Sequence, residues 1–122
     1  MRVLLAEDNP DNREMLTRRL ERRGFIVDVA EDGALAVAAA NNNRPDVVLM
    51  DVSMPVMSGL DATRALRAAP ETADLKIIAL TAHAMAAARD ECMAAGCDAF
   101  ATKPVDFAAL MDMIKTVTGK SV

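Results

Sequence analysis

Three acidic side chains stand at the ends of two short apolar runs that are typical of buried strands. Glu7 and Asp8 follow the run 3–6, and Asp51 follows the run 46–50. In open parallel sheets, ligands bind outside the carboxyl ends of the strands, so these residues are candidates for one site. Two negative charges ~4 Å apart repel by roughly 4 kcal/mol at an effective dielectric of ~20. A compensating cation is therefore expected, and an all-oxygen ligand set favours Mg²⁺.

Two further polar residues follow later apolar runs. Thr81 comes after the run 76–80, and Lys103 comes after the run 99–102. A hydroxyl donor and a fixed positive charge beside carboxylates suit a phosphoryl group. A carboxylate oxygen of Asp51 can attack phosphorus, while Mg²⁺ and Lys103 neutralise the transferred oxygens. Thr81 can then hydrogen-bond the product, which is a charged switch.

Short apolar runs alternate along the chain with longer segments of helical period. Asn9 followed by Pro10 predicts a helix start, and Ser58 with Asp61 predicts another. Strands without polar alternation, separated by helices, indicate an α/β fold with a parallel sheet covered on both faces. The predicted strands are 3–6, 25–29, 46–50, 76–80 and 99–102, and the predicted helices are 10–24, 33–43, 58–66, 84–96 and 107–117.

Composition limits the classes of function. The 122 residues, 52% of them hydrophobic and 26% charged, fit one globular domain, 1–122. A net charge of −4 gives no electrostatic basis for binding DNA or an anionic membrane. No run approaches the ~20 apolar residues of a membrane span, and no export signal is evident. The two cysteines, Cys92 and Cys97, are therefore expected to be reduced packing residues in a cytoplasmic protein.

At these residues the chain resembles the receiver domain of two-component response regulators. The single-domain type and the receiver module of a hybrid histidine kinase are both compatible with it. The resemblance covers essentially the whole chain in order. The matching stretches are 3–9 (VLLAEDN), 49–59 (LMDVSMPVMSG), 78–82 (IALTA) and 95–104 (AGCDAFATKP).

The resemblance implies a flavodoxin-like (βα)5 fold with strand order 2-1-3-4-5 and a cis peptide bond between Lys103 and Pro104. It implies that Asp51 is the phosphoacceptor and Lys103 the phosphate-binding lysine, and that Thr81 and Phe100 are paired switch residues. The implied magnesium ligands, with Mn²⁺ as a substitute ion, are Glu7, Asp8, Asp51 and the backbone carbonyl of Ser53.

The resemblance also implies the partners. A sensor histidine kinase or a histidine phosphotransfer protein would supply the phosphoryl group, and the protein would catalyse only its own phosphorylation and slow dephosphorylation. The implied output surface is the fourth helix, fifth strand and fifth helix, which would bind a downstream protein. Arg13, Arg18 and Arg19 belong to a basic first helix, whose face is either simply solvated or helps to dock the phosphodonor protein. His83 and Ser53 are expected to tune the lifetime of the phosphorylated state.

Two alternatives from other classes remain. A metal-dependent phosphohydrolase would also use Asp51 as a nucleophile, but Ser53 stands where a general acid for turnover is needed. A phosphorylation-independent interaction module would not need the acidic residues or Lys103. Multiple turnover of a phosphate ester would indicate the first, and no reaction with acetyl phosphate and Mg²⁺ would indicate the second.

Overall fold

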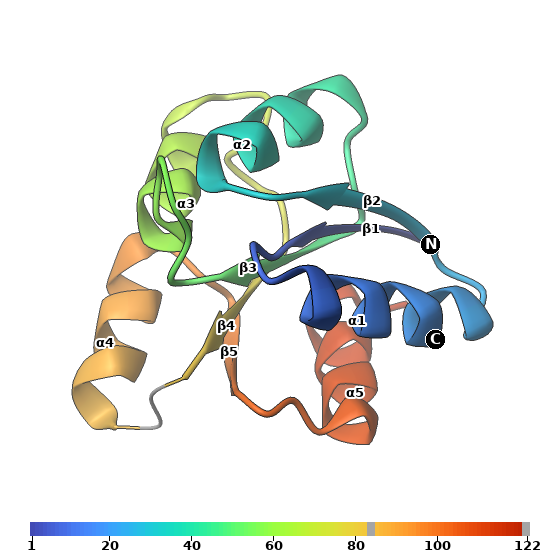
Figure 1. Cartoon of the computed structure of the whole chain (residues 1–122). Coiled ribbons are helices and arrows are strands. Elements are labelled where there is room, and N and C mark those ends of the chain that lie inside the picture. The colour runs from blue at the N-terminus through green and yellow to red at the C-terminus, as the bar shows by residue number, and fades with distance from the viewer. Residues whose placement is uncertain (83–84, 121–122) are drawn as a thin grey trace.

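The computed structural model describes residues 1–82 and 85–120, and over these ranges strands alternate with helices (Figure 1). Every predicted strand and helix is present. The strands are β1 (Arg2–Ala6), β2 (Ile26–Ala30), β3 (Val47–Asp51), β4 (Ile77–Thr81) and β5 (Ala99–Thr102). The helices are α1 (Pro10–Arg22), α2 (Gly33–Asn42), α3 (Gly59–Ala68), α4 (Ala86–Ala95) and α5 (Phe107–Thr118).

All neighbouring strands are parallel, in the order β2-β1-β3-β4-β5, as expected for a flavodoxin-like fold. The strand order reverses between β1 and β3, because β2 lies on one side of β1 and the later strands lie on the other. The register of β1 and β3 places Ala6 beside Met50, so the next residue of each chain segment, Glu7 and Asp51, lies at the same edge of the sheet. This reversal is the point where open α/β sheets bind ligands.

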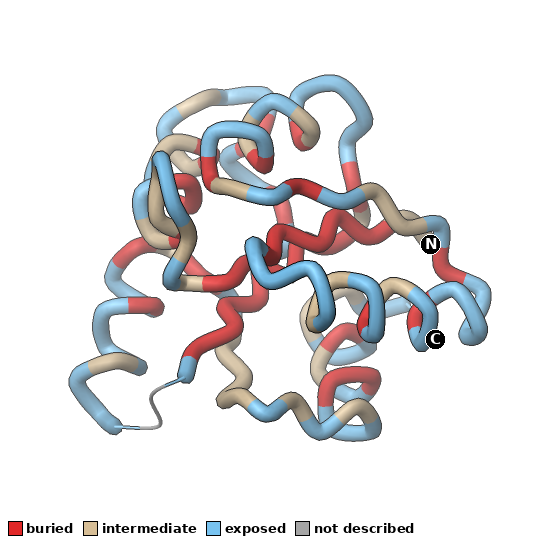
Figure 2. Tube along the Cα trace, viewed as in Figure 1, coloured by how far each residue is buried: buried red, intermediate tan, exposed pale blue. Residues whose placement is uncertain are grey.

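The apolar strands divide their side chains between two cores, one on each face of the sheet. One core joins alternate residues of β1, β3 and β4 to α2, α3 and α4. The other joins the intervening residues to α1 and α5. Figure 2 shows the buried trace running along the central strands, with exposed residues on the outer faces of the helices. Burial on both faces explains why these strands show no polar alternation.

Both cysteines belong to the first core, as the sequence predicts. Cys92 and Cys97 are free and buried. Burial raises the pKa of the Cys97 thiol to about 11. A thiol protonated at neutral pH is a poor nucleophile, so Cys97 acts as a small packing residue.

Side-chain caps explain most of the predicted helix starts. The Asn9 side chain accepts from the backbone N–H of Asn12, and Ser58 accepts from that of Asp61. The prediction for the fourth helix was less accurate, because α4 begins at Ala86 after Met85, which makes no side-chain cap hydrogen bond. Its predicted first residue, Ala84, lies outside the described residues.

Three predicted strands are displaced by one residue. The second, third and fourth begin and end one position later than predicted, so Asp51 and Thr81 are the last residues of β3 and β4 rather than the first residues after them. Asp46 lies before β3, and its carboxylate accepts from the backbone N–H of Arg2. None of the described helices is both long and apolar enough to cross a membrane.

Two glycines allow close backbone contacts around the loop between β3 and α3. A Cβ on Gly59 would lie 1.9 Å from the carbonyl oxygen of Asp51, and one on Gly33 would lie 2.1 Å from that of Met57. The Gly33 N–H also donates to the Met57 carbonyl at 3.0 Å. The loop that follows Asp51 is therefore packed directly against the starts of α2 and α3.

We expect Gly59→Ala to destabilise the protein by about 3 kcal/mol or more, because the added methyl group meets backbone that must move. Ser58→Ala, which removes only a helix cap next to it, should cost about 1 kcal/mol. Urea denaturation of both variants checks this. Equal losses of stability would show that the close approach of Gly59 to Asp51 is unimportant.

Candidate functional site

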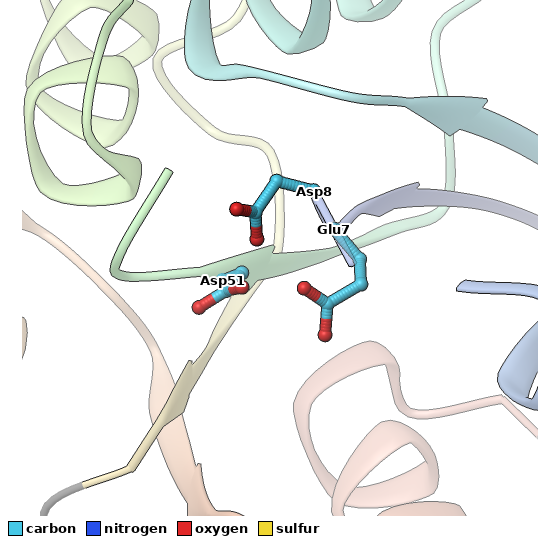
Figure 3. Close-up of side chains that lie close together, drawn as sticks. All are labelled: Glu7, Asp8 and Asp51. Atoms are coloured by element: carbon cyan, nitrogen blue, oxygen red, sulfur yellow. The ribbon is translucent and has the colours of Figure 1, made fainter. Parts of the chain in front are cut away.

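The acidic side chains come together at the carboxyl edge of the sheet. One carboxylate oxygen from each of Glu7, Asp8 and Asp51 lies within 4.8 Å of the others. Figure 3 shows the three carboxylates gathered where β1 and β3 end. Glu7 is fully buried and Asp51 is 4% exposed, whereas Asp8 is exposed. The cluster therefore has a buried side and a side open to solvent.

Lys103 reaches this cluster from the end of β5. Its Nζ donates to Glu7 Oε1 and to Asp51 Oδ2, both at 2.9 Å. Its backbone N–H donates to the Thr81 carbonyl at 2.7 Å, and its peptide bond with Pro104 is cis, as the resemblance implied. Residues nearly a hundred positions apart in the chain thus form one ion-paired group.

One ammonium cannot balance three carboxylates. The pKa values of the two buried acids, Glu7 and Asp51, show the effect of this excess negative charge. Burial raises the pKa of Asp51 to about 7, and the neighbouring Glu7 adds to the rise while Lys103 opposes it. Burial acts to raise the pKa of Glu7 as well, but hydrogen bonds with Asp51 and Lys103 outweigh it and hold this pKa below its usual value. Burial acts to lower the pKa of Lys103, and the two carboxylates outweigh it and raise this pKa.

This charge state fits a divalent cation. Without one, Glu7 stays ionised and Asp51 keeps a proton up to about pH 7, so the cluster holds less negative charge than its residues can supply. A bound cation would release that proton and offset the remaining charge. The donors are all carboxylate oxygens, which suit Mg²⁺, an ion that retains several waters and uses few protein ligands.

The other predicted site residues lie nearby but differ in their contacts. The Ser53 backbone N–H donates to Asp51 Oδ1 at 3.1 Å, a contact that fixes the Asp51 carboxylate and that the sequence did not indicate. Thr81 is 3% exposed at the end of β4, one residue past Leu80, which is the register partner of Asp51. His83 lies outside the described residues.

Phe100 does not join the acidic cluster. It lies in β5 opposite Ala79, is half-buried and packs against the core shared by α2, α3 and α4. The Arg89 guanidinium carbon of α4 lies 5.8 Å from the centre of its ring. Phe100 thus forms part of the contact between β5 and α4.

Sequence reasoning treated Arg13 only as one charge of a basic helix. In the structure its Nη1 donates to the backbone carbonyls of Glu7 at 3.0 Å and Asp8 at 3.4 Å. The Asn9 N–H also donates to Glu7 Oε2 at 3.3 Å. The available signal was spacing, since an arginine one turn past a helix N-cap can fold back toward the preceding loop.

Comparison with known proteins shows what this arrangement resembles. Residues 3–115 match the response regulator receiver domain family. The chain is 32% identical to the polar-differentiation response regulator DivK of Brucella anthropi, over 96% of this chain and 95% of that protein. It is 38% identical to hybrid signal transduction histidine kinase I of Dictyostelium discoideum over 94% of this chain, and it spans only 7% of that protein's length.

Solved structures give the same result. The receiver domain of the sensor histidine kinase PA1611 from Pseudomonas aeruginosa, solved with a magnesium ion coordinated in its active-site cleft, is 37% identical over 98% of both chains with a TM-score of 0.90. The receiver domain of Ssk1 from Saccharomyces cerevisiae, solved with the histidine phosphotransfer protein Ypd1, is 27% identical over 98% of this chain and 89% of that chain, with a TM-score of 0.89.

Proposed function

The chain belongs to the response regulator receiver family, and on that premise we propose that Asp51 is the residue that accepts its phosphoryl group. Receivers are signalling modules of two-component systems that work with histidine kinases or phosphotransfer proteins. The observation that carries the proposal is the Lys103 ammonium, which bridges Glu7 and Asp51 with Asp8 alongside. We propose that residues 1–122 form one receiver domain.

The proposed reaction moves the phosphoryl group from a phosphohistidine to Asp51. A carboxylate oxygen of Asp51 attacks phosphorus, the new P–O bond forms and the P–N bond breaks. The electron pair of that bond returns to the imidazole, which takes up a proton from solvent. Lys103, whose Nζ donates to Asp51 Oδ2 at 2.9 Å, would pair with the transferred oxygens, and the Thr81 hydroxyl would donate to one of them. The protein would catalyse only this step and the slow hydrolysis that reverses its effect.

Mg²⁺ would be held by Glu7, Asp8, Asp51 and the Ser53 carbonyl, and Mn²⁺ is expected to substitute. When bound, the ion would neutralise charge on the phosphoryl oxygens. The neighbour from P. aeruginosa, which holds magnesium in its cleft, supports this proposal. The oxygen-only cluster of this chain supports it independently.

The downstream effect is proposed to run through Thr81 and Phe100. These residues lie on the adjacent strands β4 and β5, and the Lys103 N–H joins the end of β5 to the Thr81 carbonyl. A phosphoryl group that draws Thr81 inward would disturb the packing of Phe100 against α4. The α4–β5–α5 face would then bind a downstream protein in the cytoplasm, and we propose no role in binding DNA.

The chemistry can be tested on the product itself. After incubation with acetyl phosphate and Mg²⁺, the adduct should be released by hydroxylamine, and borohydride reduction should map it to Asp51. Turnover of p-nitrophenyl phosphate far beyond one equivalent would favour the hydrolase alternative instead. No adduct under any condition would favour the phosphorylation-independent module.

We further propose that the basic face of α1 docks the phosphodonor protein. This face carries a surface hollow of about 400 Å³. Met15, half-exposed, lies at its apolar part, and the hollow adjoins the side of α1 nearest Lys103. Its charged lining residues are Asp11, Glu14, Arg18, Arg19 and Arg22.

Reversing both charges in Arg18→Glu/Arg19→Glu should slow phosphoryl transfer from a phosphotransfer protein at least about 10-fold, because steering depends on surface charge. The rate with acetyl phosphate should not change. Arg44→Glu/Arg64→Glu is the matched control, since these exposed arginines pair with Asp74 and Asp61 away from α1. Equal slowing by both double variants would argue against docking on α1.

A further inference from the structure

Arg13 connects the first turns of α1 to the loop that carries the acidic residues. Its side chain is 19% exposed and folds back over the loop. A single nitrogen, Nη1, contacts the Glu7 and Asp8 carbonyls. The other terminal nitrogen lies 3.7 Å from Glu31, whose side chain is 69% exposed. An ion pair at that distance with an exposed carboxylate contributes little, so the carbonyls are the principal partners of Arg13.

The two acids of this loop are held in different ways. The Glu7 carboxylate is buried and is fixed by Lys103 and by the Asn9 N–H. The Asp8 carboxylate is exposed, and within residues 1–82 and 85–120 it has no hydrogen-bond or ion-pair partner. Its place in the cluster is therefore set by its backbone. Arg13 donates to the carbonyls of the two peptide groups that flank the Asp8 Cα.

We propose that Arg13 is a positioning residue for the divalent-cation site, holding the backbone so that the Asp8 carboxylate faces Glu7 and Asp51. The proposal rests on the proposed function, since it assumes that the cluster binds Mg²⁺. Groups that orient metal ligands from outside the ligand set typically change metal affinity 10- to 100-fold. Arg13 acts through backbone carbonyls and contacts none of the Glu7, Asp8 and Asp51 carboxylates of the cluster.

The direction in which Mg²⁺ affinity changes when Arg13 is replaced distinguishes a positioning role from a purely electrostatic one. If charge alone matters, removing the positive charge of Arg13 should tighten cation binding, because the guanidinium repels a bound cation. Removing a group that orients one of the ligands should weaken it. Arg18, five residues further along α1, pairs with Glu14 on the exposed face and provides a matched loss of charge without contact to the loop.

The test is calorimetric titration of the full chain with Mg²⁺, with the thermal midpoint of each variant measured separately. We expect Arg13→Met to weaken Mg²⁺ binding about 10-fold and Arg18→Met to change it less than 2-fold. Arg13→Lys keeps the charge but can reach fewer acceptors, so an intermediate loss is expected. This conservative variant decides the question if Arg13→Met fails to fold.

Unchanged or tighter binding by the folded Arg13→Met variant would overturn the proposal. So would full wild-type affinity in Arg13→Lys if Arg13→Met does not fold. A wild-type protein that binds no Mg²⁺ would instead refute the proposed function itself. The two failures are therefore distinguishable in one set of titrations.

Discussion

Lys103→Met should slow phosphorylation of Asp51 by acetyl phosphate at least about 100-fold and at the same time strengthen Mg²⁺ binding. The ammonium lies 2.9 Å from both Glu7 and Asp51 and is the only cationic side chain of the described residues that contacts these carboxylates. Methionine has a similar length without the charge. Loss of one preorganised charge that stabilises the transition state typically costs 10²- to 10³-fold in rate. Loss of a competing cation leaves more negative charge for the metal.

Rates should be compared at Mg²⁺ concentrations that saturate each protein, so that the change in affinity does not hide the change in rate. Lys120→Met is the control, since that lysine is exposed and pairs with Asp46 rather than with the acidic cluster. A Lys103→Met variant that reacts at the wild-type rate, or that binds Mg²⁺ more weakly, would contradict the electrostatic account of the site.

Asp51→Asn should make the metal-free protein more stable at pH 8, by about 2–4 kcal/mol. The pKa of Asp51 rises from an ordinary value of 3.8 in the unfolded chain to about 7 in the fold. The folded state therefore binds the proton more tightly, and this contribution to stability is complete below about pH 4 and is lost as pH rises to about 7. Asparagine carries no charge to neutralise, and its amide can donate to Glu7 while its carbonyl accepts from Lys103.

Thermal denaturation in EDTA at pH 5 and pH 8 checks this prediction. The wild-type protein should lose stability relative to Asp51→Asn between the two values, and the variant should have the higher midpoint at pH 8. Added Mg²⁺ should then raise the wild-type midpoint and leave that of Asp51→Asn nearly unchanged. A less stable variant at pH 8 would show that the buried carboxylate is not a source of instability.

Most of the fold follows from the sequence because burial on both faces makes the strands continuous apolar runs and caps mark the helix starts. The ends of the strands were less well predicted. Hydrophobicity stops at Met50 and Leu80, whereas the strands continue for one further residue into Asp51 and Thr81. A polar residue can end a strand when the site at the edge of the sheet supplies its hydrogen-bond partners. A pattern of hydrophobic residues does not indicate such a position.

The meeting of Glu7, Asp51 and Lys103 was predictable, because strand ends on one edge of a parallel sheet lie close together. The detailed restraints were not. The Ser53 N–H on Asp51 and the Arg13 contacts with the preceding loop involve backbone atoms, whose directions are set by local turns. The raised pKa of Asp51 likewise depends on how deeply the site is buried, which spacing alone does not reveal.

The most direct test of the central claim is the intact mass of the protein after incubation with acetyl phosphate. Wild-type protein with Mg²⁺ should gain the mass of one phosphoryl group, and the gain should disappear in EDTA. Asp51→Asn should show no gain with Mg²⁺ present. An equal gain in Asp51→Asn, or in wild-type protein without a divalent cation, would contradict the assignment of this acidic cluster as the phosphoacceptor site.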